Sequence, residues 1–238
     1  GVMIDSYGER SLIYALLITQ LVIFFLAFIL PEKKINFTKF NKRSIWPILK
    51  KREVIVLLLS CALMVSSHGL LYNFYSIFLE DQGYSGATIG LLWSVGVVFE
   101  ILIFLLMPKI LSKFTLKSVL LISLAFAVLR FFLIGAYVDS ILILIAAQIM
   151  HAATFGSFHV ASIQLIAHFF YNEHQARGQS LYNSITYGVG GAIGGLGGGY
   201  MIEYSGMANT FMLSAILPFV GFFVLLLGLK TKFKAEFK

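Results

Sequence analysis

Glu100 and Arg130 are charged side chains that lie deep inside long apolar stretches of this sequence. Glu100 lies in LLWSVGVVFEILIFLLMP and Arg130 in LISLAFAVLRFFLIGAY. A carboxyl group isolated in hydrocarbon keeps its proton, whereas a guanidinium stays charged and needs a partner or a water-filled cavity. Intramembrane charges are costly and therefore mark functional sites. We expect Glu100 to pair with Arg130, so that protonation of Glu100 frees Arg130 for a substrate carboxylate. The alternative is an ion pair that only fixes helix packing.

A polar stripe follows the apolar segment 141–170. Its members are spaced +3, +4, +4 and +3, which places them on one helix face: Gln148, His151, Phe155, His159 and Ser162. A face of this kind suits the wall of a cavity rather than a surface against lipid. We expect His151 to join Glu100 and Arg130 in proton coupling. Gln148 and His159 are candidate substrate contacts, with a structural hydrogen bond as the alternative role for His159.

Aromatic side chains accompany these polar groups. His68, Tyr72 and Tyr75 share one face of the segment 54–79, and Trp93 lies seven residues before Glu100, hence on the face of that carboxylate. An aromatic cavity with one Arg and one titratable acid suits a small amphiphilic anion such as an aromatic carboxylate. These four residues are therefore predicted to bind substrate together with Arg130. For the two tyrosines, a place in an interfacial aromatic belt is the alternative.

The composition requires that such residues be positioned by membrane helices. The chain has 238 residues, of which 59% are hydrophobic and 12% charged, whereas soluble domains average about 45–50% and about 25%. No stretch alternates as a membrane strand would. The class is therefore an all-α membrane protein with seven transmembrane helices, predicted at 11–30, 54–79, 86–108, 116–137, 141–170, 179–202 and 208–229.

Basic residues give the predicted topology and the domain boundaries. The linker 31–53, the turn 109–117 and the tail after 229 are rich in Lys and Arg, and the alternate connections carry only acidic charges. The positive-inside rule then places the N-terminus outside and the C-terminus in the cytoplasm. Because topology explains the net charge of +7, no nucleic-acid partner is inferred. We expect 1–30 to be the last helix of a preceding half, 31–53 a cytoplasmic linker, and 54–238 a six-helix half built as a 3+3 inverted repeat.

The stretch YGVGGAIGGLGGGY at 187–200 is too apolar for a linker and lacks the spacing of a nucleotide-binding loop. Gly190, Gly194 and Gly198 recur every four residues and so form one smooth helix face. Such faces let helix backbones approach closely in lipid. We predict a tightly packed helix, with sliding of the face during gating as a further possibility.

Other kinds of chemistry are not supported. His151 and His159 are eight residues apart, about 12 Å along a helix, so one metal ion cannot take both as ligands. Ser157 and His159 are two apart and point about 200° apart, which excludes a nucleophile–base pair on one helix. We expect no enzyme activity, no metal and no cofactor.

Several blocks together resemble the major facilitator superfamily, in particular the C-terminal half of the 3-phenylpropionate-type permeases, which are relatives of lactose permease. They are HGLLYNFYSIFLEDQGYSGATIGLLWSVGVVFEILIFLLMP, LRFFLIG, HAATFGSFHVASIQLI and ARGQSLYNSITYGVGGAIGG. The resemblance implies a proton symporter of twelve helices in a bacterial inner membrane, with its N-terminal half missing here. It also implies that Glu100, Arg130 and His151 match the Glu, Arg and His used in proton coupling. Thr154 stands where lactose permease has a second Glu.

A seven-helix receptor or sensor for a small amphiphile is the alternative. It fits the helix count and the orientation. A retinal-binding version would need a buried Lys, and no predicted span has one away from its ends. The basic linker after a single helix also disfavours this class.

Overall fold

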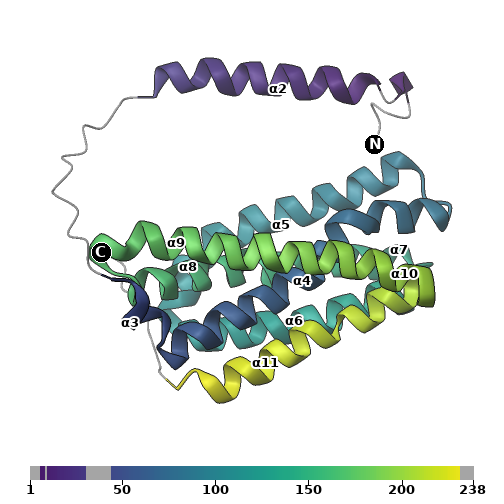
Figure 1. Ribbon diagram of the computed structural model, residues 1–238. Helices are drawn as coiled ribbons and strands as arrows, with labels where there is room; N and C mark the ends of the chain where they lie inside the picture. Colours follow the sequence, from purple (N-terminus) through teal and green to yellow (C-terminus); the bar gives the residue numbers. More distant parts are fainter. Residues whose placement is uncertain (1–5, 9, 31–43, 231–238) are drawn as a thin grey trace.

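The computed structural model describes residues 6–8, 10–30 and 44–230, and within these ranges the chain forms helices and no strand (Figure 1). The prediction of an all-α membrane protein is confirmed. Within the described residues, six helical segments are long and apolar enough to cross a bilayer, as judged by length and composition. They are α2 (Arg10–Ile29), α4 (Arg52–Asp81), α5 (Gly86–Lys113), α6 (Leu116–Ala136), the run Ile141–Phe169 and the run Asn172–Gly228.

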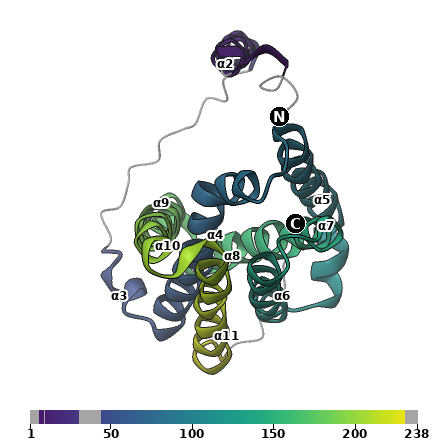
Figure 2. The same ribbon diagram turned by 90° about the vertical axis from the view of Figure 1, so that its right-hand side faces the viewer.

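The first helix stands apart from the others. Figures 1 and 2 show α2 away from the bundle, and each Leu, Ile and Phe of α2 has half or more of its surface exposed. The predicted linker 31–53 is described only from residue 44 onward. There the short helix α3 (Trp46–Leu49) and the start of α4 at Arg52 occupy part of it, so the helical structure begins earlier than predicted.

Local sequence signals set the ends of α5 and α6. The Ser85 hydroxyl accepts a hydrogen bond from the Thr88 amide at 3.2 Å, and the Thr115 hydroxyl accepts one from the Ser118 amide at 3.1 Å. Both are N-caps of the expected type. The predicted end of the third span at Pro108 is wrong, because α5 continues through this proline to Lys113. Proline removes one backbone donor and kinks a helix but need not end it.

The run Asn172–Gly228 has 57 residues, which as one straight helix would be about 85 Å long, far more than the roughly 30 Å of a bilayer core. It consists of η2 (Asn172–His174), α9 (Gln175–Asn183), η3 (Ser184–Gly190), α10 (Gly191–Ser214) and α11 (Ile216–Gly228). Gly206 divides α10 with φ 76° and ψ 166°, a conformation suited to glycine. Figure 1 shows that the chain doubles back between α10 and α11. The count of seven crossings rests on this break and stays a prediction.

Two segments depart from α-helical hydrogen bonding. The run Ile141–Phe169 consists of α7 (Ile141–Ile149), the π-helix η1 (Ala152–Ser157) and α8 (Phe158–Phe169), and η3 is a second π-helix. A π-helix inserts extra residues into a turn, changes the direction of the side chains that follow, and often occurs at functional sites. Both π-helices lie on the helices that carry predicted site residues.

Helix packing places the central run between α5 and α6. The segment α7–η1–α8 packs on both of these helices, while α4 packs on η3, α10 and α11. Figure 2 shows these helices nearly end-on. In a 3+3 repeat, the first helix of each set packs on the second and third helices of the other set. The observed contacts have this form. The repeat itself remains a prediction.

Basic side chains gather at one end of this bundle. Arg52 donates to the Leu227 carbonyl at 3.3 Å, and Lys117 donates to the Leu226 carbonyl at 2.9 Å and to the Leu229 carbonyl. Cations near a helix C-terminus satisfy free carbonyls and complement the helix dipole. We call this side of the bundle the basic end. It is the side for which the sequence predicts a cytoplasmic location.

The glycine face lies directly against α4. A Cβ atom on Gly190 would stand 2.7 Å from the Ala62 carbonyl oxygen, one on Gly194 would collide with the Ser66 carbonyl oxygen, and one on Gly198 would collide with the Leu70 side chain. Gly197, on another face of α10, has no such neighbour within 4 Å. The spacing of four therefore corresponds to a close approach between two backbones, which we call the glycine seam.

Candidate substrate and proton site

Arg130 is the centre of the predicted site and is completely buried. Its Nε donates to the Ala147 carbonyl at 2.8 Å. Its Nη1 donates to the Thr154 hydroxyl and to Nε2 of His68, both at 3.3 Å, and its Nη2 donates to Oε1 of Gln148 at 3.3 Å. These partners are neutral groups. They satisfy four of the five guanidinium donors, which leaves one N–H of Nη2 for another acceptor.

The predicted ion pair between Glu100 and Arg130 is wrong. Within the described residues, no carboxylate oxygen lies within the 4.0 Å ion-pair distance of the Arg130 guanidinium. Glu100 lies instead near His151, with 3.7 Å between Oε2 and Nε2. The reason is topological, because η1 packs between α5 and α6 and keeps the two side chains apart. Gly156 of η1 makes room for Glu100, since a Cβ there would stand 3.3 Å from the Glu100 Cγ.

His68 is held in one protonation state by its two neighbours. Its Nδ1 lies 3.0 Å from the Met64 carbonyl oxygen, which can only accept, and its Nε2 lies 3.3 Å from Arg130, which can only donate. The ring must therefore be neutral, with its proton on Nδ1. The sequence predicts His68 as a substrate contact. The structure shows it as a hydrogen-bond partner of Arg130.

Three buried polar atoms near Arg130 have no hydrogen-bond partner. They are Nε2 of Gln148, Nδ1 of His151 and the hydroxyl of Tyr75. The three side chains are at least 95% buried. Buried polar groups without partners are rare and indicate a bound water, ion or ligand. The Gln148 amide and the Tyr75 hydroxyl are donors beside a guanidinium that also has a free donor, which is an arrangement suited to a carboxylate.

Aromatic rings line the same region. Tyr72 stacks on Trp93 with 6.1 Å between centroids, and Tyr75 meets Trp93 edge-to-face at 5.5 Å. Trp93 donates to the Ser76 hydroxyl at 3.0 Å. Tyr72 also lies 6.3 Å from Phe155 and has 46% of its surface exposed. The structure thus brings together the predicted aromatic residues of α4 and α5.

The histidine stripe continues past the π-helix. His151 stacks on Phe155 at 5.3 Å, and Phe155 stacks on His159 at 6.0 Å. The His159 Nδ1 lies 2.9 Å from the hydroxyl of Tyr187 on η3. The Phe155 ring therefore lies between His159 and His151. Tyr187 was missed in the sequence because it lies in the glycine-rich stretch, where the spacing of the glycines dominated the interpretation.

Comparisons with known proteins show the family of the chain. A family model described as "MFS_1 like family" matches residues 1–213. The chain belongs to this family. The Escherichia coli (strain K12) protein named "Probable 3-phenylpropionic acid transporter" is 33% identical over 163 residues, which cover 68% of this chain and 42% of that protein. The Bacillus subtilis (strain 168) protein named "Uncharacterized transporter YwbF" is 26% identical over 150 residues, which cover 63% of this chain and 37% of that protein.

The MFS_1-like chain thus resembles the 3-phenylpropionate-type permeases, as predicted. It spans about two fifths of the length of these curated relatives. Its apolar helical segments make it a multi-pass membrane protein. In the part of the MFS_1-like chain that the structure describes, no three His, Cys, Asp or Glu side chains come together as metal ligands would.

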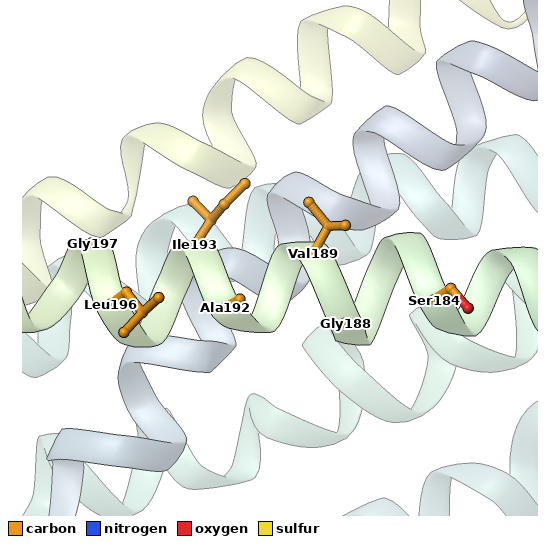
Figure 3. A pocket seen from close by; sticks show the side chains of 7 residues that line it. All are labelled: Ser184, Gly188, Val189, Ala192, Ile193, Leu196 and Gly197. Carbon is orange, nitrogen blue, oxygen red and sulfur yellow. The ribbon is translucent and has the colours of Figure 1, made fainter.

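Two hollows in this MFS_1-like protein lie away from Arg130. One, of about 660 Å³, is shallow and lies on η3 and α10, where Val189, Ile193 and Leu196 point outward beside small residues (Figure 3). The other, of about 450 Å³, lies between α4, α10 and α11. Neither is lined by a predicted proton-coupling or substrate-binding residue, so the candidate site rests on the cluster around Arg130.

Proposed function

We propose that this chain is part of a secondary transporter that carries a small organic anion, in particular an aromatic carboxylate, together with a proton by alternating access. The relatives that are named as transporters support transport over catalysis. We include in this proposal the twelve-helix architecture, the bacterial inner membrane, and the predicted orientation with the C-terminus in the cytoplasm.

The observation that carries the proposal is the uncompensated charge of Arg130. A fully buried guanidinium that is bonded only to neutral groups is an unfavourable arrangement, because burial of an unpaired charge is costly. A substrate carboxylate would supply the missing charge. It would take the free N–H of Arg130 and the unpartnered donors of Gln148 and Tyr75.

The aromatic residues favour a substrate with a ring. Tyr72 and Trp93 are stacked, and the exposed part of Tyr72 offers a further surface for stacking. Phe155 faces Tyr72 from the opposite helix. A phenyl group attached to a short acid chain fits this combination, and the name of the Escherichia coli relative is consistent with it.

Glu100 and His151 are the proposed proton site. The distance of 3.7 Å between them allows one proton to be shared when the site tightens. Because Glu100 is separate from Arg130, its protonation state does not decide whether Arg130 is free. Thr154 has a neutral side chain. Glu100 would therefore carry the proton in this half without the help of a second carboxylate.

A receptor for the same anion is the second candidate. The cluster around Arg130 would serve a receptor equally well, since it shows binding chemistry and not movement. Both relatives are named as transporters, which favours the first candidate. Net accumulation of substrate against a gradient separates the two.

The test uses the complete polypeptide in energised membrane vesicles. Addition of 3-phenylpropionate is expected to raise the external pH as protons enter with the substrate. Glu100→Gln is expected to abolish this rise and net accumulation, while exchange of labelled substrate continues. Glu203→Gln is a matched control, because Glu203 is an exposed acid on α10 away from the site.

Two results would contradict the proposal in different ways. Normal alkalinisation by Glu100→Gln would remove Glu100 from the coupling mechanism. Tight binding of 3-phenylpropionate by the wild type with no pH change would exclude proton symport of this substrate and favour a uniporter or receptor.

A further inference from the structure

The pair formed by His159 and Tyr187 has no part in the function proposed above. It joins α8 to η3 by a 2.9 Å contact between Nδ1 and the tyrosine hydroxyl. Both side chains are only partly buried. A partly exposed histidine in an apolar span, bonded to a hydroxyl, is a candidate for a site that exchanges protons with water.

The chemistry of the hydroxyl permits this exchange. A tyrosine O–H can donate to Nδ1 of a neutral imidazole, and its oxygen can accept from Nδ1–H of an imidazolium. The contact between His159 and Tyr187 therefore survives in both protonation states. His68 differs, because a carbonyl oxygen and a guanidinium occupy its two nitrogens and both demand the neutral ring. Of these two histidines, His159 is the one whose partner tolerates a change of charge.

The pair lies between the proposed proton site, Glu100 with His151, and the basic end of the bundle. His151, beside Glu100, and His159 stack on opposite sides of Phe155, at 5.3 Å and 6.0 Å. Ser162, one turn further along α8, contacts Cys61 at 3.4 Å, and Cys61 lies in the first third of α4, which starts at the basic end with Arg52. The order along the bundle is thus Glu100 with His151, then Phe155, then His159 with Tyr187, then the basic end.

The other titratable groups around His159 are few. From α9, the ring of Tyr182 lies 6.3 Å from that of His159 and 6.0 Å from that of Tyr187, and from η3 Tyr187 makes the bond already described. From α4, Cys61 reaches α8 at Ser162. From α5, Glu100 lies 3.7 Å from His151, the residue that stacks on Phe155. From α6, Arg130 donates to Thr154 and Gln148 and makes no hydrogen bond to His159 or Tyr187 among the described residues.

We propose that His159 and Tyr187 form a second proton-binding station, between the Glu100–His151 site and the basic end, with Phe155 separating the two stations. The inference rests on the proton coupling proposed above. The proton leaves the Glu100 carboxyl group, which becomes a carboxylate, and passes by water to the imidazole of His159, which becomes an imidazolium bonded to the Tyr187 oxygen. The imidazolium then releases the same proton to water at the basic end.

The test compares variants of the complete polypeptide in vesicles of both orientations, so that the pH on each side of the membrane is set separately. The readouts are substrate-induced proton movement with 3-phenylpropionate, and exchange of labelled 3-phenylpropionate at equal pH. His159→Gln is expected to slow proton movement by about a hundredfold, the lower end of what a positioned acid–base group contributes. It is also expected to remove the dependence of the rate on the pH at the basic end.

Tyr187→Phe provides a second variant, which keeps the imidazole and removes only its partner. It is expected to shift the pH dependence at the basic end while exchange at equal pH stays as in the wild type. His168→Gln is the matched control, because it removes an exposed histidine from the same helix outside the station. A purely structural role of the bond would change exchange and proton movement together.

The outcomes separate this inference from the function on which it rests. If the wild type couples 3-phenylpropionate to protons, and His159→Gln and Tyr187→Phe keep its rate and pH dependence on both sides, the second station is wrong and the proposed function stands. If the wild type moves no protons with this substrate, the proposed function fails and the station fails with it.

Discussion

His68 on α4 and His159 on α8 are both histidines inside apolar spans, and they show opposite uses of the same side chain. His68 is completely buried, and its nitrogens face a carbonyl oxygen and a guanidinium. His159 is partly exposed, and its Nδ1 faces a hydroxyl that can donate or accept. The first region fixes one protonation state, while the second tolerates both. The difference lies in the partners, and it teaches that burial in a membrane span does not by itself make a histidine a proton carrier.

The difference also matches the two tasks that the proposed symport requires. In that proposal, the region of His68 holds Arg130 and its fixed positive charge in place for an anion. The region of His159 offers a place where charge can change without loss of a hydrogen bond. Glu100 and His151 lie between them, in contact with neither Arg130 nor Tyr187 through a hydrogen bond or ion pair within the described residues.

The largest expected effect comes from breaking the glycine seam that holds α4 against α10. Gly194→Leu would drive a side chain into the backbone of Ser66 and Gly69, next to His68. Because overpacking of this kind costs about 1–3 kcal/mol or more, we expect little folded protein. Gly197→Leu is the control, since nothing lies within 4 Å of its Cβ position. Detergent-extracted yield and thermal stability measure the effect, and equal values for the two variants would mean that the seam is dispensable.

The next effect comes from giving Arg130 a protein carboxylate. Thr154→Asp places an acid where a hydroxyl now stands 3.3 Å from Nη1 of Arg130. The aspartate would compete with the substrate for hydrogen bonds worth about 1.5–3 kcal/mol, and the affinity for 3-phenylpropionate should fall by about 12- to 150-fold. Thr154→Asn has the same shape without the charge and should bind nearly as the wild type does. Calorimetric titration measures both, and identical affinities would show that Arg130 is not the anion site.

The smallest effect separates the two histidines. His68→Gln keeps an acceptor near Arg130 and removes the ring, so we expect a loss of affinity for 3-phenylpropionate of about 2- to 12-fold, the equivalent of one net hydrogen bond. The pH dependence of transport should stay unchanged, in contrast to that of His159→Gln. A flattened pH profile in His68→Gln would contradict the assignment of a fixed neutral ring.

Several features could be predicted from the sequence because a simple periodicity determines them. The apolar spans follow from length and composition, and the spacing of four in Gly190, Gly194 and Gly198 predicts a closely packed helix face, although only the structure shows that its partner is α4. The stack of His151, Phe155 and His159 follows from steps of four residues on one helix. Each of these depends on one helix and its own repeat.

Other features depend on how separate helices are arranged, which one sequence does not show. The pairing of Glu100 with Arg130 was predicted from similar depth in the membrane, yet η1 packs between their helices. The π-helices change the direction of side chains without any distinctive residue pattern, so the meeting of Tyr187 with His159 could not be foreseen. The break at Gly206, by contrast, falls between the spans 179–202 and 208–229 that the sequence predicts.

The central claim is that a substrate carboxylate, and not a protein carboxylate, neutralises the buried charge of Arg130. The most direct test measures binding of 3-phenylpropionate and of its neutral amide, 3-phenylpropionamide, to the wild type and to Arg130→Gln of the complete polypeptide. We predict that the wild type prefers the carboxylate by about 12-fold or more, as a charged hydrogen bond requires, and that Arg130→Gln loses this preference. Equal binding of acid and amide by the wild type would contradict the account.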